Sequence, residues 1–411
     1  MIHQLKVSVE NKCGFSIKNR GDCVRLSSLI MLETGIDLSY NTLRRFFNLV
    51  KSTKPHKSTL DILSKYTGYE SYVNFSSVYP EKKSWDAYQK VYEKIVKNPI
   101  KALRLIEEEF ENPADYNQLL ITLIGGLTVM KRLEILKKVF DSELLNPERF
   151  NYSEILYFGN CVGPMFRQMR INISLLLSTK YFTPIVFNSF IDISSLNGNY
   201  GNFTKKINTI TTDEEQHLFT SCILELRSFL NTKKIKKVIT SLKIDEIHPI
   251  LYGRYAGIAI LDSNESNKPD KALQFLNQIS ERENKIDYLY EFIFACILGR
   301  ELGILKLIEK KMMNYKISKP YYQEYHYSLF ELRDAILLLE SGQNIDKEID
   351  HLKEKTMFRN SHRDFIEVFI SILEYHNSGK NEAKLKNYTN LSQKVNYPIF
   401  DKAYCFNYFD S

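Results

Sequence analysis

Residues 22–68 carry closely spaced signals for the beginnings and ends of three short helices. Asp22 can cap a helix over CVRLSSLIMLET, and Gly35 can end it. Ser39 can cap a second helix over YNTLRRFFNLV. The string STLD, at residues 58–61, matches a capping box for a third helix that ends at Gly68. Signals at this spacing predict a compact unit of three or four short helices that ends near residue 78.

The rest of the chain has the pattern of longer helices. The 411 residues include only 16 glycines and 11 prolines, below the usual shares of roughly 7% and 5%. From residue 85 onward, apolar residues recur at helical spacing. The segments NPIKALRLIEEEF, from Asn98, and NKPDKALQFLNQI, from Asn267, are similar to each other. Ala102 and Ala272 lie 170 positions apart, five times the length of a 34-residue tetratricopeptide repeat. The predicted fold class is therefore all-α, with an α-solenoid of tetratricopeptide-like helical hairpins after the N-terminal unit.

One segment interrupts the predicted array. Residues 191–212 (IDISSLNGNYGNFTKKINTITT) are rich in Asn, Ser, Thr and Gly, which predicts a loop or hinge. A helix restarts after it, with residues 212–215 as a capping box. Small residues in RYAGIAIL, from Arg254, suit close packing of two helices. The predicted organisation is a short-helix domain over 1–78, array segments over 79–190 and 213–411, and a loop or hinge over 191–212.

The positive charge of the chain is concentrated at its N-terminal end. The net charge is +7, and residues 1–80 contain eleven Lys or Arg against six Asp or Glu. The six cysteines are scattered without a C-x-x-C pair, which predicts reduced, mostly buried thiols. No apolar run reaches the roughly 18 residues that a membrane helix needs, and no export signal is apparent. These features predict a cytoplasmic protein without a membrane partner.

The sequence contains no catalytic signature. No two histidines have the i, i+4 spacing of a metal-binding helix, and His351 and His362 are expected to be ordinary surface or core residues. Gly125 and Gly126 lie in an apolar run without the Lys-Ser/Thr of a phosphate loop. We therefore expect no enzymatic activity, no cofactor and no metal site.

The segment YNTLRRFFNLV gives the best indication of function. On a helical wheel its apolar residues fall on one side, and four polar residues fall on the other. Arginine can pair with guanine O6 and N7 in the DNA major groove, and asparagine can pair with adenine N6 and N7. Neighbouring polar and basic residues can hold phosphates. The candidate DNA-binding residues are Tyr40, Asn41, Arg44, Arg45, Asn48, Lys51, Lys54 and Lys57.

The order LSSLIMLETG, LSYNTLRRFFN, KPHKSTLDILSKYTGY resembles helices two to four of the Cro/λ-repressor-like helix-turn-helix domain. It also resembles the N-terminal module of many uncharacterised Bacteroidetes proteins. The resemblance covers residues 20–75 and implies a first helix, which we expect within Leu5–Phe15. The turn departs from the family pattern, because its first apolar residue in register, Leu43, comes two positions late. Met31 also replaces a usually small alanine.

Two functions from different classes follow. In the first, the chain is a DNA-binding transcriptional regulator of double-stranded DNA. Its C-terminal helical array would form a homodimer or bind a peptide or protein ligand, a plan similar to the peptide-sensing regulators of Gram-positive bacteria. In the second, the chain is a non-catalytic interaction scaffold, and its helix-turn-helix-like module does not bind DNA.

Overall fold

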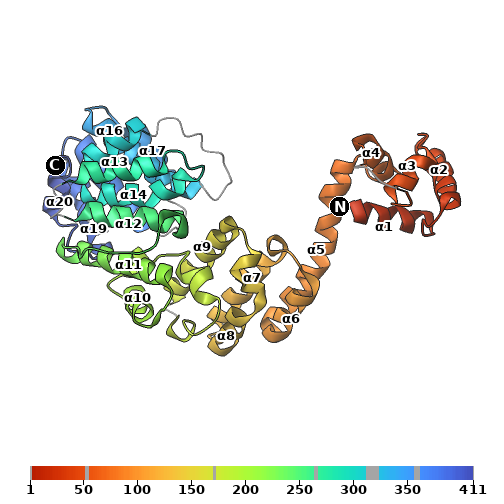
Figure 1. Cartoon of the computed structure of the whole chain (residues 1–411), viewed down its shortest axis with the longest axis horizontal. Helices are drawn as coiled ribbons and strands as arrows, with labels where there is room; N and C mark the ends of the chain where they lie inside the picture. Colours follow the sequence, from red (N-terminus) through yellow and green to blue (C-terminus); the bar gives the residue numbers. More distant parts are fainter. Residues whose placement is uncertain are drawn as a thin grey trace. The chain divides into compact units, whose positions relative to one another are not determined.

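The computed structural model describes residues 2–50, 55–169, 173–262, 267–311, 324–355 and 362–410. Within these ranges the regular structure is helical and includes no strand, which confirms the predicted all-α class (Figure 1). The chain divides into two compact units, Met1–Glu111 and Asn112–Ser411. No helix in the described ranges is long and apolar enough to cross a membrane.

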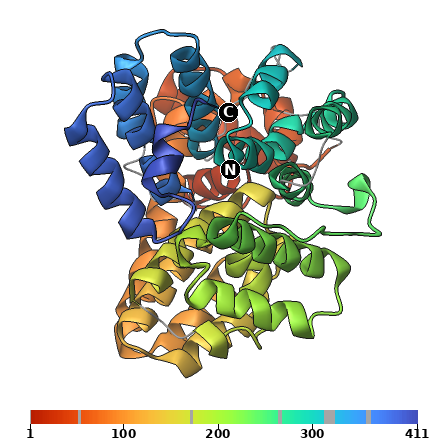
Figure 2. The ribbon, with the colours of Figure 1, turned by 90° about the vertical axis from the view of Figure 1, so that its left-hand side faces the viewer.

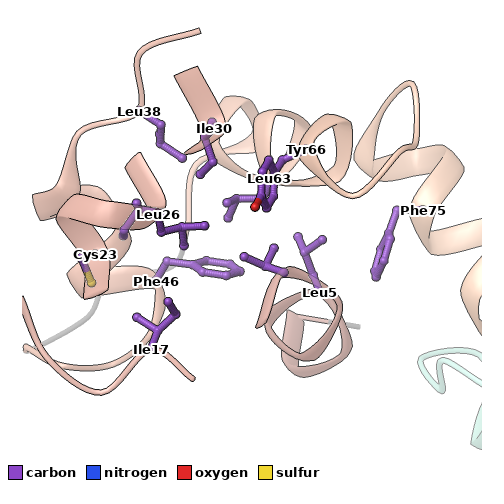
Figure 3. Close-up of a cluster of buried hydrophobic side chains, with 12 residues drawn as sticks. Leu5, Ile17, Cys23, Leu26, Ile30, Leu38, Phe46, Leu63, Tyr66 and Phe75 are labelled. Atoms are coloured by element: carbon purple, nitrogen blue, oxygen red, sulfur yellow. The ribbon is translucent and has the colours of Figure 1, made fainter. Parts of the chain in front are cut away.

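Unit 1 is built on a small apolar core. Its helices are α1 (Ile2–Cys13), α2 (Arg20–Thr34), α3 (Tyr40–Phe46), α4 (Lys57–Tyr66), α5 (Tyr72–Lys97) and α6 (Pro99–Glu109). Helix α2 packs against α3 and α4, and α4 also packs against α1 and α5. Leu5, Leu26, Phe46 and Leu63 point into one interior from α1, α2, α3 and α4 (Figure 3). Each of these four helices therefore contributes a buried face to one core.

The helix boundaries in unit 1 differ in part from the predicted ones. Asn19, and not Asp22, caps α2. The two residues form a reciprocal capping box, in which the Asn19 side chain accepts from the Asp22 N–H and Asp22 accepts from the Asn19 N–H. Gly35 ends α2 with a φ of 69°, as expected of a C-terminal glycine. Helix α4 begins at Lys57, and Asp61 accepts a hydrogen bond from the Tyr72 N–H instead of completing a capping box.

The first unit extends beyond the predicted boundary at residue 78. Helix α5 runs without a break from Tyr72 to Lys97, so residue 78 lies inside it. Helix α5 packs against α4, which precedes it in the sequence, and against α6, which follows it. The described unit consequently ends at Glu111, after α6.

Unit 2 is a larger array of helices. Its α-helices in the described ranges are α7 (Pro113–Val129), α8 (Leu133–Asp141), α9 (Tyr152–Met169), α10 (Asn199–Ile210), α11 (Glu214–Thr232), α12 (Pro249–Leu261), α13 (Lys268–Ile279), α14 (Lys285–Gly299), α15 (Leu302–Lys311), α16 (Glu324–Glu340), α17 (Asp346–Lys355), α18 (Arg363–Asn377), α19 (Glu382–Val395) and α20 (Lys402–Phe406). Short helical turns lie at Glu143–Leu145, Pro147–Arg149, Ile173–Leu175, Thr183–Phe187, Ile193–Ser195 and Ile244–Glu246. Helices α12, α14, α16 and α18 pack one on the next, while α13 packs on α15. The tetratricopeptide-like repeat itself stays a prediction.

The glycines of RYAGIAIL and its flank allow α12 and α14 to pack closely. A Cβ added to Gly253 would lie 1.9 Å from the Tyr288 carbonyl oxygen. A Cβ added to Gly257 would lie 2.7 Å from the Ala295 Cβ. Contacts this short leave no room for a side chain, so the small residues bring the two helices together as predicted.

Residues 191–212, predicted as a loop or hinge, contain α10 and are hydrogen-bonded to Tyr397, which follows α19. Helix α10 lies beside α11 (Figure 2). The Tyr397 hydroxyl donates to the Ile193 carbonyl at 2.6 Å and accepts from the Leu196 N–H at 3.0 Å. The small residues serve close packing, since a Cβ on Gly201 would overlap the Leu196 carbonyl oxygen. The predicted capping box at 212–215 is also replaced, because Asp213 caps α11.

Candidate nucleic-acid interface

The turn between α2 and α3 is fixed by specific hydrogen bonds. The Gly35 N–H donates to the Met31 carbonyl at 2.9 Å, closing the end of α2. The Ser27 hydroxyl donates to the Leu38 carbonyl at 2.7 Å, and the Leu38 side chain is buried. Met31, at the position where the resembled family has a small alanine, is 49% exposed. Its bulk therefore points away from the contact between α2 and α3, and Leu38 fills the longer turn.

Helix α3 has one buried side and one polar side. Ser39 caps it as predicted, with its hydroxyl accepting from the Asn41 N–H. Leu43 and Phe46 are buried in the core of unit 1. Asn41 and Arg45 are exposed, and Arg44 is half-buried. The structure thus brings three of the predicted residues together on the outer side of a two-turn helix.

Arg44 and Asn41 contact each other on this side. The Arg44 Nη1 donates to the Asn41 Oδ1 at 3.3 Å. This bond joins residues at i and i+3, which are neighbours on a helix surface. It occupies one acceptor of the amide and leaves its two N–H donors for other partners. Arg45, one residue further on, is exposed.

Asn48 does not lie on α3, contrary to the prediction of a helix that extends to Val50. The helix ends at Phe46, and Asn48 has a left-handed φ of 59°. The Asn48 N–H donates to the Arg45 carbonyl and the Leu49 N–H donates to the Arg44 carbonyl, the pattern of a Schellman motif. Asparagine is the residue after glycine that most often adopts this conformation, and this was the missed signal in the sequence.

The flanking residues are only partly assembled around α3. Tyr40 is half-buried, and the Arg20 guanidinium lies 5.0 Å from the centre of its ring and donates to its hydroxyl at 3.3 Å. Lys57 is exposed at the first turn of α4. Lys51 and Lys54 lie outside the described residues. Arg20 was not predicted, because no local pattern links it to a residue twenty positions away.

Two ionisable groups near α3 are altered by burial. Burial raises the pKa of the Cys23 thiol, and the nearby Arg44 charge opposes this effect. Lys6 lies 5.5 Å from the centre of the Phe46 ring, and partial burial lowers the pKa of its amine. Cys23 therefore remains a protonated core residue at neutral pH. The chemistry available on this face is hydrogen-bond donation from arginine and asparagine.

Comparison of the chain with family models, with curated proteins and with solved structures found no match.

Proposed function

We propose that this chain is a cytoplasmic DNA-binding transcriptional regulator. Asn41, Arg44 and Arg45 would enter the major groove of double-stranded DNA from α3. Unit 2 would act as a tetratricopeptide-like sensing or oligomerisation domain that binds a ligand or a second copy of the chain. No catalytic step and no cofactor is part of this proposal.

The main support is the two-sided character of α3. Leu43 and Phe46 hold the helix in the core of unit 1, while Asn41 and Arg45 face solvent. A recognition helix needs this arrangement, because its base-reading side chains must project from a rigid support. Arginine and asparagine are also the side chains best suited to bidentate pairing with guanine and adenine.

The residues around α3 suit contacts with phosphates. Arg20 and Lys57 are exposed at the N-terminal ends of α2 and α4. The stacking of Arg20 on Tyr40 places a guanidinium and a phenol beside the first turn of α3. Such contacts position a protein on DNA without reading the sequence. We include Arg20 with the predicted Tyr40 and Lys57 as a phosphate-contacting group.

Selection from a random double-stranded DNA library with the intact protein tests this proposal. We expect enrichment of a short sequence containing guanine and adenine at adjacent positions. Affinity for the selected sequence should fall with salt, by a log–log slope of about −0.9 for each neutralised phosphate. Failure to enrich any sequence, together with weak binding that does not depend on salt, would contradict the proposal.

One observation favours the alternative of an interaction scaffold. Helix α2 exposes Val24, Met31 and Leu32, and Leu32 is 83% exposed. These residues lie within about 100° of one another on the helix and form a small apolar strip. Recovery of a specific protein on immobilised intact chain, lost in Leu32→Asp and retained in Arg44→Ala/Arg45→Ala, would support this alternative.

A further inference from the structure

Unit 2 contains a partly open cavity of about 690 Å³. Its wall is formed mainly by α9, α11, α12 and α14, with residues 184–191 and His362 completing it. Small-molecule sites in proteins usually have volumes of about 300–1,000 Å³. Aromatic side chains are prominent in the wall, from Tyr152, Tyr157, Phe219 and Tyr290. The cavity therefore has the size and much of the surface chemistry of a ligand site.

A buried group of polar side chains forms one end of the cavity. The Arg254 Nη2 donates to the Glu291 Oε1 at 2.7 Å, and both side chains are about 5% exposed. The His362 Nε2 lies 3.7 Å from the same carboxylate oxygen, and its Nδ1 is bonded to the Tyr290 hydroxyl at 3.0 Å. Burial alone would raise the pKa of Glu291, but Arg254 and His362 hold it below its usual range. Arg254 and Glu291 are thus a charged pair.

Arg254 retains hydrogen-bonding capacity at this end. Its Nε–H is buried and has no acceptor among the described residues. Buried donors in native proteins nearly always have an acceptor, so such groups usually have a partner in the working state. Because the Nε atom itself is covered, a ligand oxygen reaches it only if the Arg254 side chain turns toward the cavity that it lines.

The cavity wall carries more negative than positive charge. Its described lining contains three carboxylates, from Asp213, Glu215 and Glu291, against the single guanidinium of Arg254. Counting only these carboxylates and the guanidinium, the excess is two negative charges. The backbone N–H of His248 donates to the Glu215 Oε1 at 2.6 Å, so this carboxylate is fixed at the cavity wall.

We propose that this cavity binds a small organic cation, an amine that carries an aromatic or apolar group. The excess carboxylates attract the ammonium group, and the aromatic faces favour both the cation and the apolar group. An oxygen atom on the same ligand can accept from Arg254. The proposal gives a ligand class to the sensing role of unit 2, and its test does not involve DNA, so either can fail without the other.

Three compounds with one carbon skeleton can separate charge from shape. Phenethylamine, 2-phenylethanol and phenylacetate present a cation, a neutral group and an anion on the same aromatic body. Titration calorimetry with the full chain should give a dissociation constant for the amine about tenfold or more below that of the alcohol. Phenylacetate should bind most weakly. Equal binding of amine and alcohol, or tighter binding of the acid, would overturn the proposal. So would the absence of amine binding up to 10 mM, a concentration that corresponds to a binding free energy of only roughly 2.7 kcal/mol.

A matched pair of variants locates the bound cation. Glu215→Gln removes one charge from the cavity but keeps an oxygen that can accept from the His248 N–H. Glu214→Gln makes the same change one residue earlier on α11, at an exposed position outside the cavity lining. Amine binding should weaken about three- to tenfold in Glu215→Gln and remain unchanged in Glu214→Gln. An equal effect in both variants, with unchanged melting temperatures, would place the cation elsewhere.

Discussion

Asn48 is the residue whose backbone conformation limits α3. An L-residue other than glycine, asparagine or aspartate loses about 1–2 kcal/mol in the left-handed region. We therefore expect Asn48→Val to lower the free energy of unfolding by about 1–2 kcal/mol and Asn48→Gly to change it by less than about 0.5 kcal/mol. Urea unfolding monitored by amide hydrogen exchange within unit 1 measures both changes in the free energy of unfolding. As a control, Asn41→Val makes the same substitution within the helix and should have little effect.

Arg44 and Arg45 are the residues on which the proposed DNA contact depends. Arg44→Ala/Arg45→Ala should weaken binding to the selected sequence by about tenfold or more, since each bidentate base contact contributes about 1–3 kcal/mol. Competition gel shifts with selected and random DNA would measure the loss. The preference for the selected sequence should fall as well as the affinity.

The control for this experiment removes the same charge elsewhere in unit 1. Lys101 and Arg104 are both exposed on α6. Lys101→Ala/Arg104→Ala should reduce affinity by less than about twofold if only the charge near α3 matters. An equal loss in the two double variants would mean that net charge, and not α3, controls binding.

The residue scale also shows how far the sequence could predict the candidate site. Asn41, Arg44 and Arg45 were predictable, because the spacing of Leu43 and Phe46 fixes which side of α3 is buried. The position of Asn48 was not predicted, because Phe47 continues the apolar pattern past the actual end of the helix. Arg20 reaches Tyr40 only through the packing of α2 on α3, which no local spacing encodes.

At the scale of elements, the close contact of α12 with α14 depends on Gly253. A methyl group there would overlap the Tyr288 carbonyl oxygen, so Gly253→Ala should destabilise unit 2 by roughly 3 kcal/mol or more. Thermal unfolding measured by circular dichroism would detect this as a clear fall in the melting temperature.

Gly303 provides a matched control for the change at Gly253. It is an exposed glycine within α15, and a Cβ added there would meet nothing within 4 Å. Gly303→Ala should leave stability unchanged or raise it by up to about 1 kcal/mol, because alanine favours helix. Similar destabilisation by both changes would mean that the close contact of α12 with α14 does not determine the stability of unit 2.

Elements were predicted well where the sequence signal is local. Asn98 caps α6 and Ser39 caps α3, both close to where the sequence places helix starts. Residues 191–212 were not, because their composition is typical of loops. Their helix is stabilised by distant partners, such as the stacking of Tyr200 on Phe187 at 4.5 Å between ring centres. Small and polar residues there serve packing, and composition alone cannot distinguish that use from a loop.

At the scale of the whole molecule, one arginine joins two carboxylates with opposite titration behaviour. The Arg167 guanidinium lies 3.3 Å from Asp192 and 2.6 Å from Asp364. Burial raises the pKa of Asp192 to about 6, helped by the charge of Asp364 and opposed by Arg167. Burial would also raise the pKa of Asp364, but bonds from Ser194 and Arg167 lower it to about 2.

These pKa values give opposite signs to the pH dependence of stability. The folded state holds the Asp192 proton more tightly than the unfolded chain does, so its contribution to stability falls as pH rises from about 4 to about 6. Asp192→Asn should remove this loss. The free energy of unfolding of the variant, relative to that of the parent protein, should therefore rise by about 2–3 kcal/mol from pH 4 to pH 8. Urea midpoints across that range provide the measurement.

Asp364 should behave in the opposite way. Its contribution is present above the unfolded pKa of about 3.9 and is lost as pH falls toward 2. Asp364→Asn should therefore destabilise unit 2 by about 2–3 kcal/mol at pH 7, with a smaller difference at pH 3. If the two variants showed parallel pH profiles, the opposed titration of the two carboxylates would be incorrect.

The bond from Tyr397 to residues 193 and 196 has a consequence for how the protein is made. It closes a loop of about two hundred residues, and Tyr404 and Tyr408 likewise donate to carbonyls of Leu298 and Ile297. These contacts cannot form until residues 397–408 have left the ribosome. The buried cluster formed by α1–α4 and the start of α5 comes from residues 5–75 and can assemble while the rest is still being translated. The α1–α4 part of unit 1 should thus be native on the nascent chain, while unit 2 is completed only after residues 397–408 have emerged.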